Sequence, residues 1–168
     1  AMQEAKIEPV WKNGLRYTDG QTIDIVERTL NGEINLGVCE NIQIRNGRPI
    51  GVKGQEIFRC ERLEKDQDGN EIDLGYVGSI TSVETNRLKK YLKQDYMPIV
   101  SPVATDRNGQ NYNVNADTAA GHLAAAVGAR RLVYLCDVPG LLRDPKDHGT
   151  LISSLSEAEV PGLRADGI

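Results

Sequence analysis

Apolar residues spaced three and four apart along the chain predict several short amphipathic helices. The first follows an N-cap at Thr18 or Asp19, and Asn31-Gly32 is expected to break or kink it. The predicted inward-facing residues are Ile23, Val26 and Leu30 in this helix, Ile34, Val38 and Ile42 in a second over 33–44, and Leu88, Tyr91 and Leu92 in a third over 84–94. Ser153 or Ser156 is the predicted start of a last helix, with acidic residues in its first turn.

Strands are predicted where apolar residues alternate with polar ones or form short continuous runs. Residues 56–63 alternate, and 72–77 are the predicted returning strand of a hairpin whose tip is 66–70. Residues 48–53 are short and strand-like. The runs at 97–103 and 131–136 show little alternation, which is typical of parallel strands covered on both faces. Strands in alternation with helices favour a layered α/β sheet with a hairpin insertion.

Residues 111–121 combine an extended segment with the start of an Ala-rich helix that ends near Gly128. Asn113 and Asn115 fall on one side of the extended part, and Asp117 falls in the first helical turn. The simplest interpretation is a capped helix, with Asn115 as N-cap. The alternative is a ligand site, because α/β folds bind ligands at the carboxyl ends of strands.

Length and composition narrow the class of protein. The chain has 168 residues with 39% hydrophobic residues, 26% charged residues and a net charge of -4, which fits one globular domain. This charge gives no reason to expect a nucleic acid or an anionic membrane as partner, and no apolar run reaches the length of a membrane span. Cys39, Cys60 and Cys136 form no CxxC pair, so reduced thiols in the cytoplasm are expected.

A second polar strand end lies downstream, where Asp137 and a Pro-Gly turn follow the predicted strand 131–136. Because strands joined by one crossover helix usually lie parallel and close together, both polar ends are expected at the same edge of the sheet. An Asn pair can bind a carboxylate or an amide, a Pro-Gly turn can line a nucleotide, and Asp117 can orient a lysine that bridges phosphates. These residues alone predict a general ligand-binding α/β site.

Four segments, in matching order and spacing, make the prediction narrower. They are NGLRYTD at 13–19, DLGYVG at 73–78, YNVNADTAA at 112–120 and LCDVPGLLRD at 135–144. Together they resemble the N-acetylglutamate kinases, enzymes of arginine biosynthesis in the amino-acid kinase superfamily, and the resemblance runs from about residue 9 to residue 168.

The resemblance implies a three-layer αβα sandwich of the amino-acid kinase type over residues 1–168, with a mostly parallel central sheet and a β-hairpin insertion, incomplete at both ends. It implies that ATP phosphorylates the side-chain carboxylate of N-acetyl-L-glutamate to an acyl phosphate without a covalent enzyme intermediate. Catalysis then consists of positioning and charge neutralisation. Mg²⁺ would accompany ATP, held mostly by phosphates and water, so no metal ligand is expected from the chain.

Residue roles follow from the same resemblance. Arg16 matches the arginine that grips a substrate carboxylate, Asn113 matches a substrate-binding asparagine, and Asn115 lies in the same motif. Asp117 matches the aspartate that organises the catalytic lysines. The residues matching the nucleotide-lining loop are Asp137, Val138, Gly140, Leu141 and Leu142.

The sequence also departs from the family pattern. An initial strand with a lysine and a glycine-rich turn, and a later phosphate-bridging lysine, have no match; Lys53 and Lys146 lie outside such motifs. The 168-residue chain by itself is therefore expected to be weakly active or inactive. The alternatives are a non-catalytic metabolite-binding or regulatory module of this fold, another amino-acid kinase (aspartate, glutamate or carbamate type), or part of a longer protein. A homodimer or a swapped oligomer is expected, because an open sheet edge invites pairing.

Overall fold

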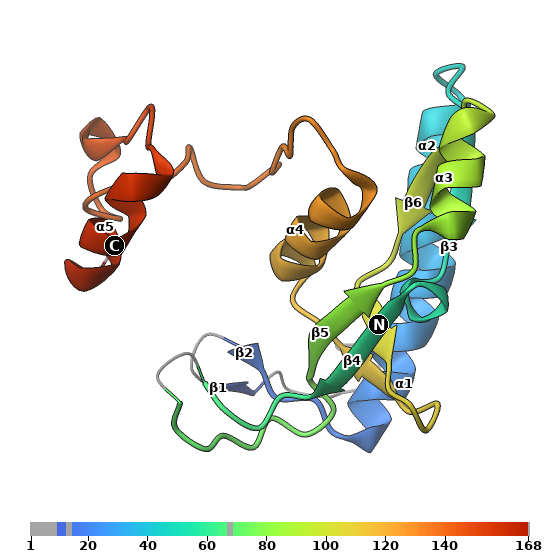
Figure 1. The fold of residues 1–168 in the computed structure, drawn as a ribbon, viewed down its shortest axis with the longest axis horizontal. Coiled ribbons are helices and arrows are strands. Elements are labelled where there is room, and N and C mark those ends of the chain that lie inside the picture. The colour runs from blue at the N-terminus through green and yellow to red at the C-terminus, as the bar shows by residue number, and fades with distance from the viewer. Residues whose placement is uncertain (1–9, 13–14, 67–68, 168) are drawn as a thin grey trace. The chain divides into compact units, whose positions relative to one another are not determined.

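The computed structural model describes residues 10–12, 15–66 and 69–167. The chain packs as two compact units, divided between Leu132 and Val133, and each unit is described by itself. The elements of the first unit are β1 (Trp11–Lys12), β2 (Leu15–Arg16), α1 (Gly20–Arg28), the π-helix η1 (Thr29–Ile34), α2 (Asn35–Gln43), β3 (Pro49–Val52), the 3₁₀ turn η2 (Gly54–Glu56), β4 (Phe58–Arg62), β5 (Gly78–Val83), α3 (Asn86–Lys93), β6 (Met97–Val100), β7 (Val103–Thr105), β8 (Asn111–Asn113) and α4 (Ala116–Val127) (Figure 1). Those of the second are the 3₁₀ turns η3 (His148–Thr150) and η4 (Glu157–Glu159), followed by α5 (Val160–Ala165).

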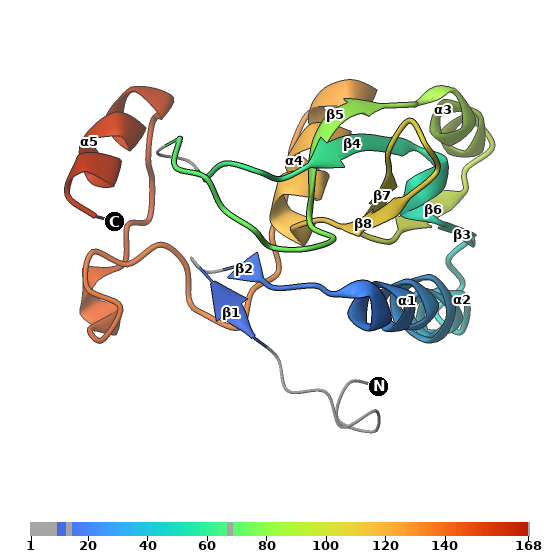
Figure 2. The same ribbon diagram turned by 90° about the horizontal axis from the view of Figure 1, so that it is seen from below.

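Strands β3 to β8 of the first unit form a layer with helices on both sides, and β1 and β2 form a separate antiparallel pair. Strands β3 and β6 pair in parallel. A four-stranded sheet has the order β5-β4-β7-β8, in which β4 and β7 are parallel and the two outer pairs are antiparallel. Figure 2 shows the α1–α2 helical segment on one side of the strands and α3 and α4 on the other. This arrangement confirms the predicted layered α/β class.

The first helix begins as predicted. The Asp19 carboxylate caps α1 by accepting a hydrogen bond from the Thr22 N–H at 2.7 Å, and hydrogen bonding from Thr22 lowers the pKa of Asp19. The α-helix is interrupted around Asn31-Gly32, as predicted, but the chain does not leave the helical conformation. The chain stays helical there by widening into the π-helix η1, and continues as α2.

The inward face of α2 differs from the prediction. Ile34 and Val38 are 53% and 40% exposed, whereas Asn35 is 5% exposed. The reason is a hydrogen bond that sequence spacing does not reveal, from Asn35 Nδ2 to the backbone carbonyl of Ile99 at 2.8 Å. With this amide hydrogen-bonded, Asn35 rather than Ile34 or Val38 lies deepest against the strands.

Helix α3 shows a smaller departure from the prediction. Leu88 is buried, as expected, but Leu92 is 49% exposed. The helix packs on β6, and Leu92 lies in its last turn, one residue before the helix ends.

The hairpin prediction is partly right. The tip is a turn, in which Gly69 has a φ of +85° and donates its N–H to the Asp66 carbonyl at 3.1 Å. Asp68, the other predicted turn residue, lies outside the described residues. The returning strand is wrong, since β4 pairs with β5 and residues 72–77 make only isolated bridges. Those bridges connect this segment to Thr18 and Asn113, and they build the site described below.

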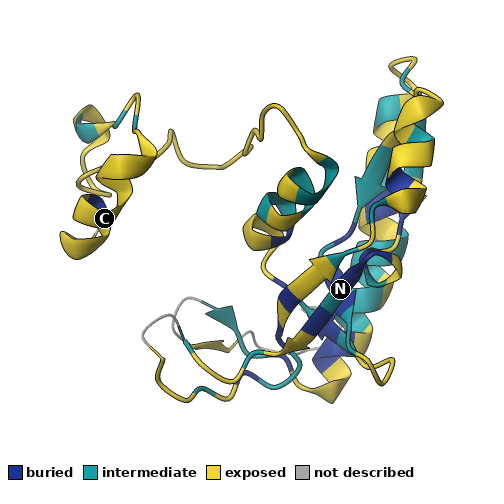
Figure 3. Cartoon of the chain, viewed as in Figure 1, coloured by how far each residue is buried: buried dark blue, intermediate teal, exposed yellow. Residues whose placement is uncertain are grey.

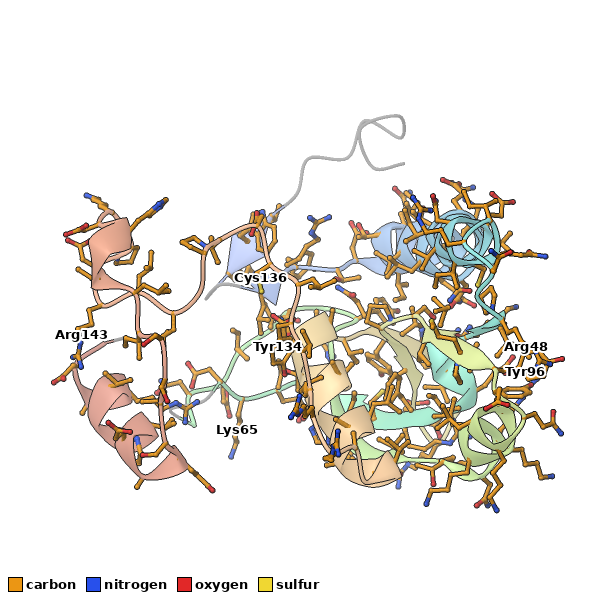
Figure 4. The ribbon with its side chains drawn as sticks, turned by 90° about the horizontal axis from the view of Figure 1, so that it is seen from above. Arg48, Lys65, Tyr96, Tyr134, Cys136 and Arg143 are labelled. Atoms are coloured by element: carbon orange, nitrogen blue, oxygen red, sulfur yellow. The ribbon has the colours of Figure 1, made fainter. Side chains whose placement is uncertain are left out.

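Two further strand predictions are changed by the structure. The run at 97–103 is divided into β6 and β7 at Ser101-Pro102, because proline lacks the N–H that a continuous ladder needs. Residues 131–136 form no strand, and their side chains are exposed, with Leu135 at 97%. This segment pairs with no strand in the described part of the chain, and Figure 4 shows Tyr134 and Cys136 along it.

The last helix follows the predicted signal. Ser156 and Glu159 form a capping box. The Ser156 N–H donates to Glu159 Oε2 at 2.8 Å, and the Ser156 side chain accepts a hydrogen bond from the Glu159 backbone N–H.

None of the helices in the described part of the chain combines the length and the apolarity needed to cross a membrane.

The core lies between the mixed sheet and the helices on its faces, where Figure 3 shows the buried positions gathered. Its largest fully buried residues are Phe58, Ile57, Leu74, Leu88, Val103 and Thr18. Thr18 is the polar member of this set, and its side-chain partners belong to the candidate site.

Replacing Phe58 tests this core. Phe58→Ala should lower the free energy of unfolding by about 3–5 kcal/mol, because a residue 1% exposed would leave a cavity. The exposed Leu92→Ala serves as control, with an expected change of about 0.5 kcal/mol. Denaturant unfolding measures both, and equal losses would contradict this assignment of the core.

Candidate functional site

Three segments far apart in sequence meet at the centre of the site. The Thr18 N–H donates to the Leu74 carbonyl at 3.0 Å, the Tyr76 N–H donates to the Thr18 carbonyl at 2.7 Å, and the Asn113 N–H donates to the Tyr76 carbonyl at 2.9 Å. The corresponding bridges are parallel. This pairing, called the Thr18 crossing below, joins residues 16–18, 74–77 and 112–114.

The crossing also orients the Asn113 side chain. Asn113 Nδ2 donates to Thr18 Oγ1 at 3.3 Å, and that hydroxyl donates to the Arg16 carbonyl at 3.3 Å. Thr18 has no exposed surface, so these bonds satisfy a buried hydroxyl. The amide of Asn113 is thereby held in a fixed orientation beside Arg16.

A cavity of about 180 Å³ gathers all three predicted substrate-binding residues. Within it the Arg16 guanidinium lies over the Trp11 ring, 5.0 Å from the ring centroid. A guanidinium and amides among aliphatic side chains suit a small ligand that carries a carboxylate and an apolar group. The cavity is lined by Trp11, Leu15, Arg16, Val77, Asn113, Val114 and Asn115.

A larger cavity, of about 880 Å³, shares Leu15, Val77, Val114 and Asn115 with the first. It extends to Lys65 on the hairpin and to Thr118 in the first turn of α4. The N-terminus of α4 and Lys65 favour anions, whereas the carboxylate of Asp66, which also lines this cavity, opposes them. The sequence analysis did not identify Lys65 and Thr118 as site residues. Lys65 directly precedes the predicted hairpin tip, and no sequence spacing connects Lys65 to α4.

Asn115 satisfies both interpretations of its motif. Its Oδ1 accepts hydrogen bonds from the Thr118 N–H at 2.9 Å and from Thr118 Oγ1 at 3.1 Å, which makes it the N-cap of α4. It also lines both cavities. Asp117 lies in the first turn of α4 as predicted and is exposed, and it is not among the residues that line these cavities. Its role with catalytic lysines stays a prediction.

Strand alternation gives the crossing two different faces. Arg16, Val77 and Asn113 line the small cavity, whereas their neighbours Tyr17, Tyr76 and Tyr112 line a separate cavity of about 280 Å³. The Tyr76 and Tyr112 rings lie 6.0 Å apart between centroids. Burial raises the pKa of Tyr112.

Asp73 and Gly75 hold the middle segment of the crossing. Asp73 Oδ1 accepts hydrogen bonds from the Gly75 N–H at 2.9 Å and from Arg62 Nη2 at 2.8 Å. The first of these bonds, together with Arg62, holds the pKa of Asp73 below its usual value of 3.8. Gly75 has a φ of +69°, and a Cβ there would lie 2.2 Å from the Thr18 carbonyl oxygen.

The second unit contains the five residues predicted to line a nucleotide. Gly140 has a φ of +145°, and the loop is anchored by a bridge between Leu142 and Leu151 and by the Ile152 N–H, which donates to the Leu141 carbonyl at 2.9 Å. Asp137 to Leu142 form an exposed loop, except that Leu142 is half-buried. Nucleotide binding by this loop stays a prediction.

No group of three or more His, Cys, Asp or Glu side chains in the described residues could hold a metal ion.

The family model described as the amino acid kinase family matches residues 1–167. The chain belongs to this family. The predicted superfamily is thereby confirmed, and with it the amino-acid kinase fold.

Relatives within the family narrow the resemblance. The chain is 44% identical over 169 residues to the acetylglutamate kinase of Akkermansia muciniphila, covering 99% of this chain and 57% of that protein. It is 39% identical over 176 residues to the acetylglutamate kinase of Methanobrevibacter smithii, covering 100% of this chain and 60% of that protein. The chain thus spans little more than half the length of these curated relatives.

Solved structures agree on the fold. The crystal structure of smu.665 from Streptococcus mutans matches with a TM-score of 0.75 at 24% identity, over 84% of this chain and 56% of that one. N-acetylglutamate synthase from Neisseria gonorrhoeae, complexed with coenzyme A and N-acetyl-glutamate, matches with a TM-score of 0.74 at 23% identity, over 97% of this chain and 36% of that one. Identities this low show the fold alone.

Two glycines with the same backbone conformation test the crossing. Gly109, with a φ of +83°, has open space around it, whereas Gly75 faces the Thr18 carbonyl. Gly109→Ala should cost about 1–2 kcal/mol of stability from the positive φ alone. Gly75→Ala should cost about 1–3 kcal/mol more, because the methyl group must displace the paired backbone. Thermal unfolding measures the difference, and equal losses would mean that the close approach is absent.

Acid unfolding tests the Asp73 bonds. Because the folded pKa of Asp73 lies below 3.8, the ionised carboxylate adds stability at every pH above 3.8, and this is lost as the pH falls through the folded pKa. Asp73→Asn should therefore lower the melting temperature at neutral pH and reduce the further loss below pH 3.8. Arg62→Gln should act in the same direction but only in part. An Asp73→Asn variant with the full wild-type acid sensitivity would contradict these contacts.

Proposed function

We propose that this chain is part of an acetylglutamate kinase and that the cavity lined by Arg16, Asn113 and Asn115 binds N-acetyl-L-glutamate. The observation that carries the proposal is the convergence of these three residues, from opposite ends of the first unit, on one cavity. Relatives at about 40% identity bearing that name support it.

The chemistry of the cavity fits the substrate. The Arg16 guanidinium can bind one carboxylate in a bidentate manner, and the fixed Asn113 amide can donate to a second oxygen. Leu15, Val77 and Val114 offer an apolar surface to the methyl group of the acetyl substituent. The reactive carboxylate would then extend toward the larger cavity, where Lys65 and the α4 N-terminus favour negative charge and Asp66 opposes it.

The transfer itself would be an in-line attack by the substrate carboxylate oxygen on the γ-phosphorus of ATP. The P–O bond to ADP breaks as the acyl phosphate bond forms, and no covalent enzyme intermediate is involved. The chain's residues contribute positioning and local positive charge. We assign Asp117 to organising cationic groups near the phosphates and the loop 137–142 to the nucleotide, with Mg²⁺ carried by ATP. We further propose that the protein is cytoplasmic and forms a homodimer or a swapped oligomer, because an open sheet edge invites pairing.

Calorimetry on the chain tests substrate binding directly. Arg16→Ala should weaken binding of N-acetyl-L-glutamate by about 10–100-fold, the value of a charge-assisted hydrogen bond. Arg45→Ala, an exposed arginine at the end of α2, removes the same charge and should change the affinity less than about twofold.

Competing ligands and turnover separate the alternatives. L-glutamate, L-aspartate and carbamate in the same titration identify another amino-acid kinase if one of them binds more tightly. ADP release that depends on N-acetyl-L-glutamate, with hydroxylamine trapping of the acyl phosphate, distinguishes a kinase from a binding module. Equal weakening by Arg16→Ala and Arg45→Ala would reject the assigned cavity.

A further inference from the structure

A network of hydrogen-bonded polar side chains connects the helical segment to β8, the strand that carries Asn113. Glu27 Oε2 accepts a hydrogen bond from Asn111 Nδ2 at 2.8 Å, and Glu27 Oε1 accepts one from Gln55 Nε2 at 2.8 Å. Asn31 Nδ2 donates to Gln55 Oε1 at 3.1 Å, and Ser101 Oγ donates to Asn31 Oδ1. Both oxygens of one carboxylate are thus used to hold two different segments.

The π-helix explains why these residues can share one face. Glu27, Asn31 and Asn35 are four apart, and four residues overshoot one turn of an α-helix by about 40°. In η1 the Asn35 N–H donates to the Leu30 carbonyl, five residues earlier, so the turn is wider and offsets this drift. All three polar side chains therefore face the strands, with Asn35 bonded to the Ile99 carbonyl at 2.8 Å.

The contact with β8 lies two residues from the candidate substrate residue. Asn111 and Asn113 are the first and last residues of β8, and their side chains point to the same side of that strand by alternation. β8 pairs with β7 on one edge, with Thr105 opposite Asn111, and Asn113 touches the Thr18 crossing. Glu27 therefore holds the start of a three-residue strand whose end presents the ligand-binding amide.

We propose that Glu27 is a positioning residue for Asn113 and acts through Asn111. The π-helix η1 keeps Glu27 on the same face of the helical segment as Asn31 and Asn35. For the identity of the ligand this inference rests on the proposed function. Glu27 holds β8 in register and so keeps the Asn113 amide beside Arg16. It touches no ligand itself.

The test uses the whole chain and compares Glu27→Gln with Glu33→Gln. Glu33 is exposed on the same helical segment, so the two substitutions change charge equally. Glutamine at 27 can accept from only one of the two donors, and its own N–H₂ opposes the other. Asn111→Ala and the double variant complete a double-mutant cycle.

The first readout does not depend on the ligand. In ¹⁵N–¹H spectra of the ligand-free chain, well below the unfolding temperature, the Asn113 side-chain amide should shift in Glu27→Gln and in Asn111→Ala but not in Glu33→Gln. The second readout is calorimetric affinity for N-acetyl-L-glutamate, which should fall about tenfold in Glu27→Gln and in Asn111→Ala, with no further fall in the double variant.

An unchanged Asn113 resonance in Glu27→Gln overturns the positioning role, as does a shifted resonance with unchanged affinity. Additive losses in the double variant also overturn it, because they would mean that Glu27 does not act through Asn111. If the wild-type chain fails to bind N-acetyl-L-glutamate, the proposed function falls, and the amide resonance alone then decides the positioning inference.

Discussion

The candidate site depends on one buried residue whose polar groups are all bonded. Thr18 donates its N–H to Leu74, accepts from Tyr76 at its carbonyl, and uses its hydroxyl both as donor to Arg16 and as acceptor from Asn113. A fully buried threonine without these partners would be costly. Every one of these bonds goes to one of the three crossing segments. The hydrogen bonds that Thr18 needs are therefore formed only when the three segments come together as the site.

The crossing also separates two chemically different faces. Side chains alternate along each segment, so Arg16 and Asn113 face one cavity while Tyr17 and Tyr112 face another. A slip of one residue in any segment would exchange these sets. Gly75 prevents such a slip in the middle segment, because only a residue without a side chain allows the approach to the Thr18 carbonyl.

The helical segment behind the strands shows how a site can be supported at some cost in apolar packing. Its inward face carries Glu27, Asn31 and Asn35 in hydrogen bonds, while Ile34 and Val38 are exposed. Apolar residues on that face would bury more hydrocarbon, but they could not fix the direction of β8. π-helices are rare in proteins overall, but those that occur are often found at functional sites. The π-helix η1 fits a role in supporting the site.

Local sequence signals determined the elements that end in caps and turns. Asp19, Asn115, Gly128 and Ser156 mark helix ends by hydrogen bonds or backbone angles that depend on a few neighbouring residues, and the structure agrees at each. The motifs around Arg16 and Asn113 likewise indicated the amino-acid kinase superfamily, and the family match confirms it.

Tertiary structure decided whatever depends on a distant partner. Asn35 turned inward because the Ile99 carbonyl was available, and residues 72–77 bridge Thr18 and Asn113 instead of pairing with β4. Residues 131–136 have the composition of a buried strand but pair with no described strand. Lys65 reaches the larger cavity only through the fold of the hairpin. Side-chain spacing records which residues share a face, but only the partner's position decides which face is buried.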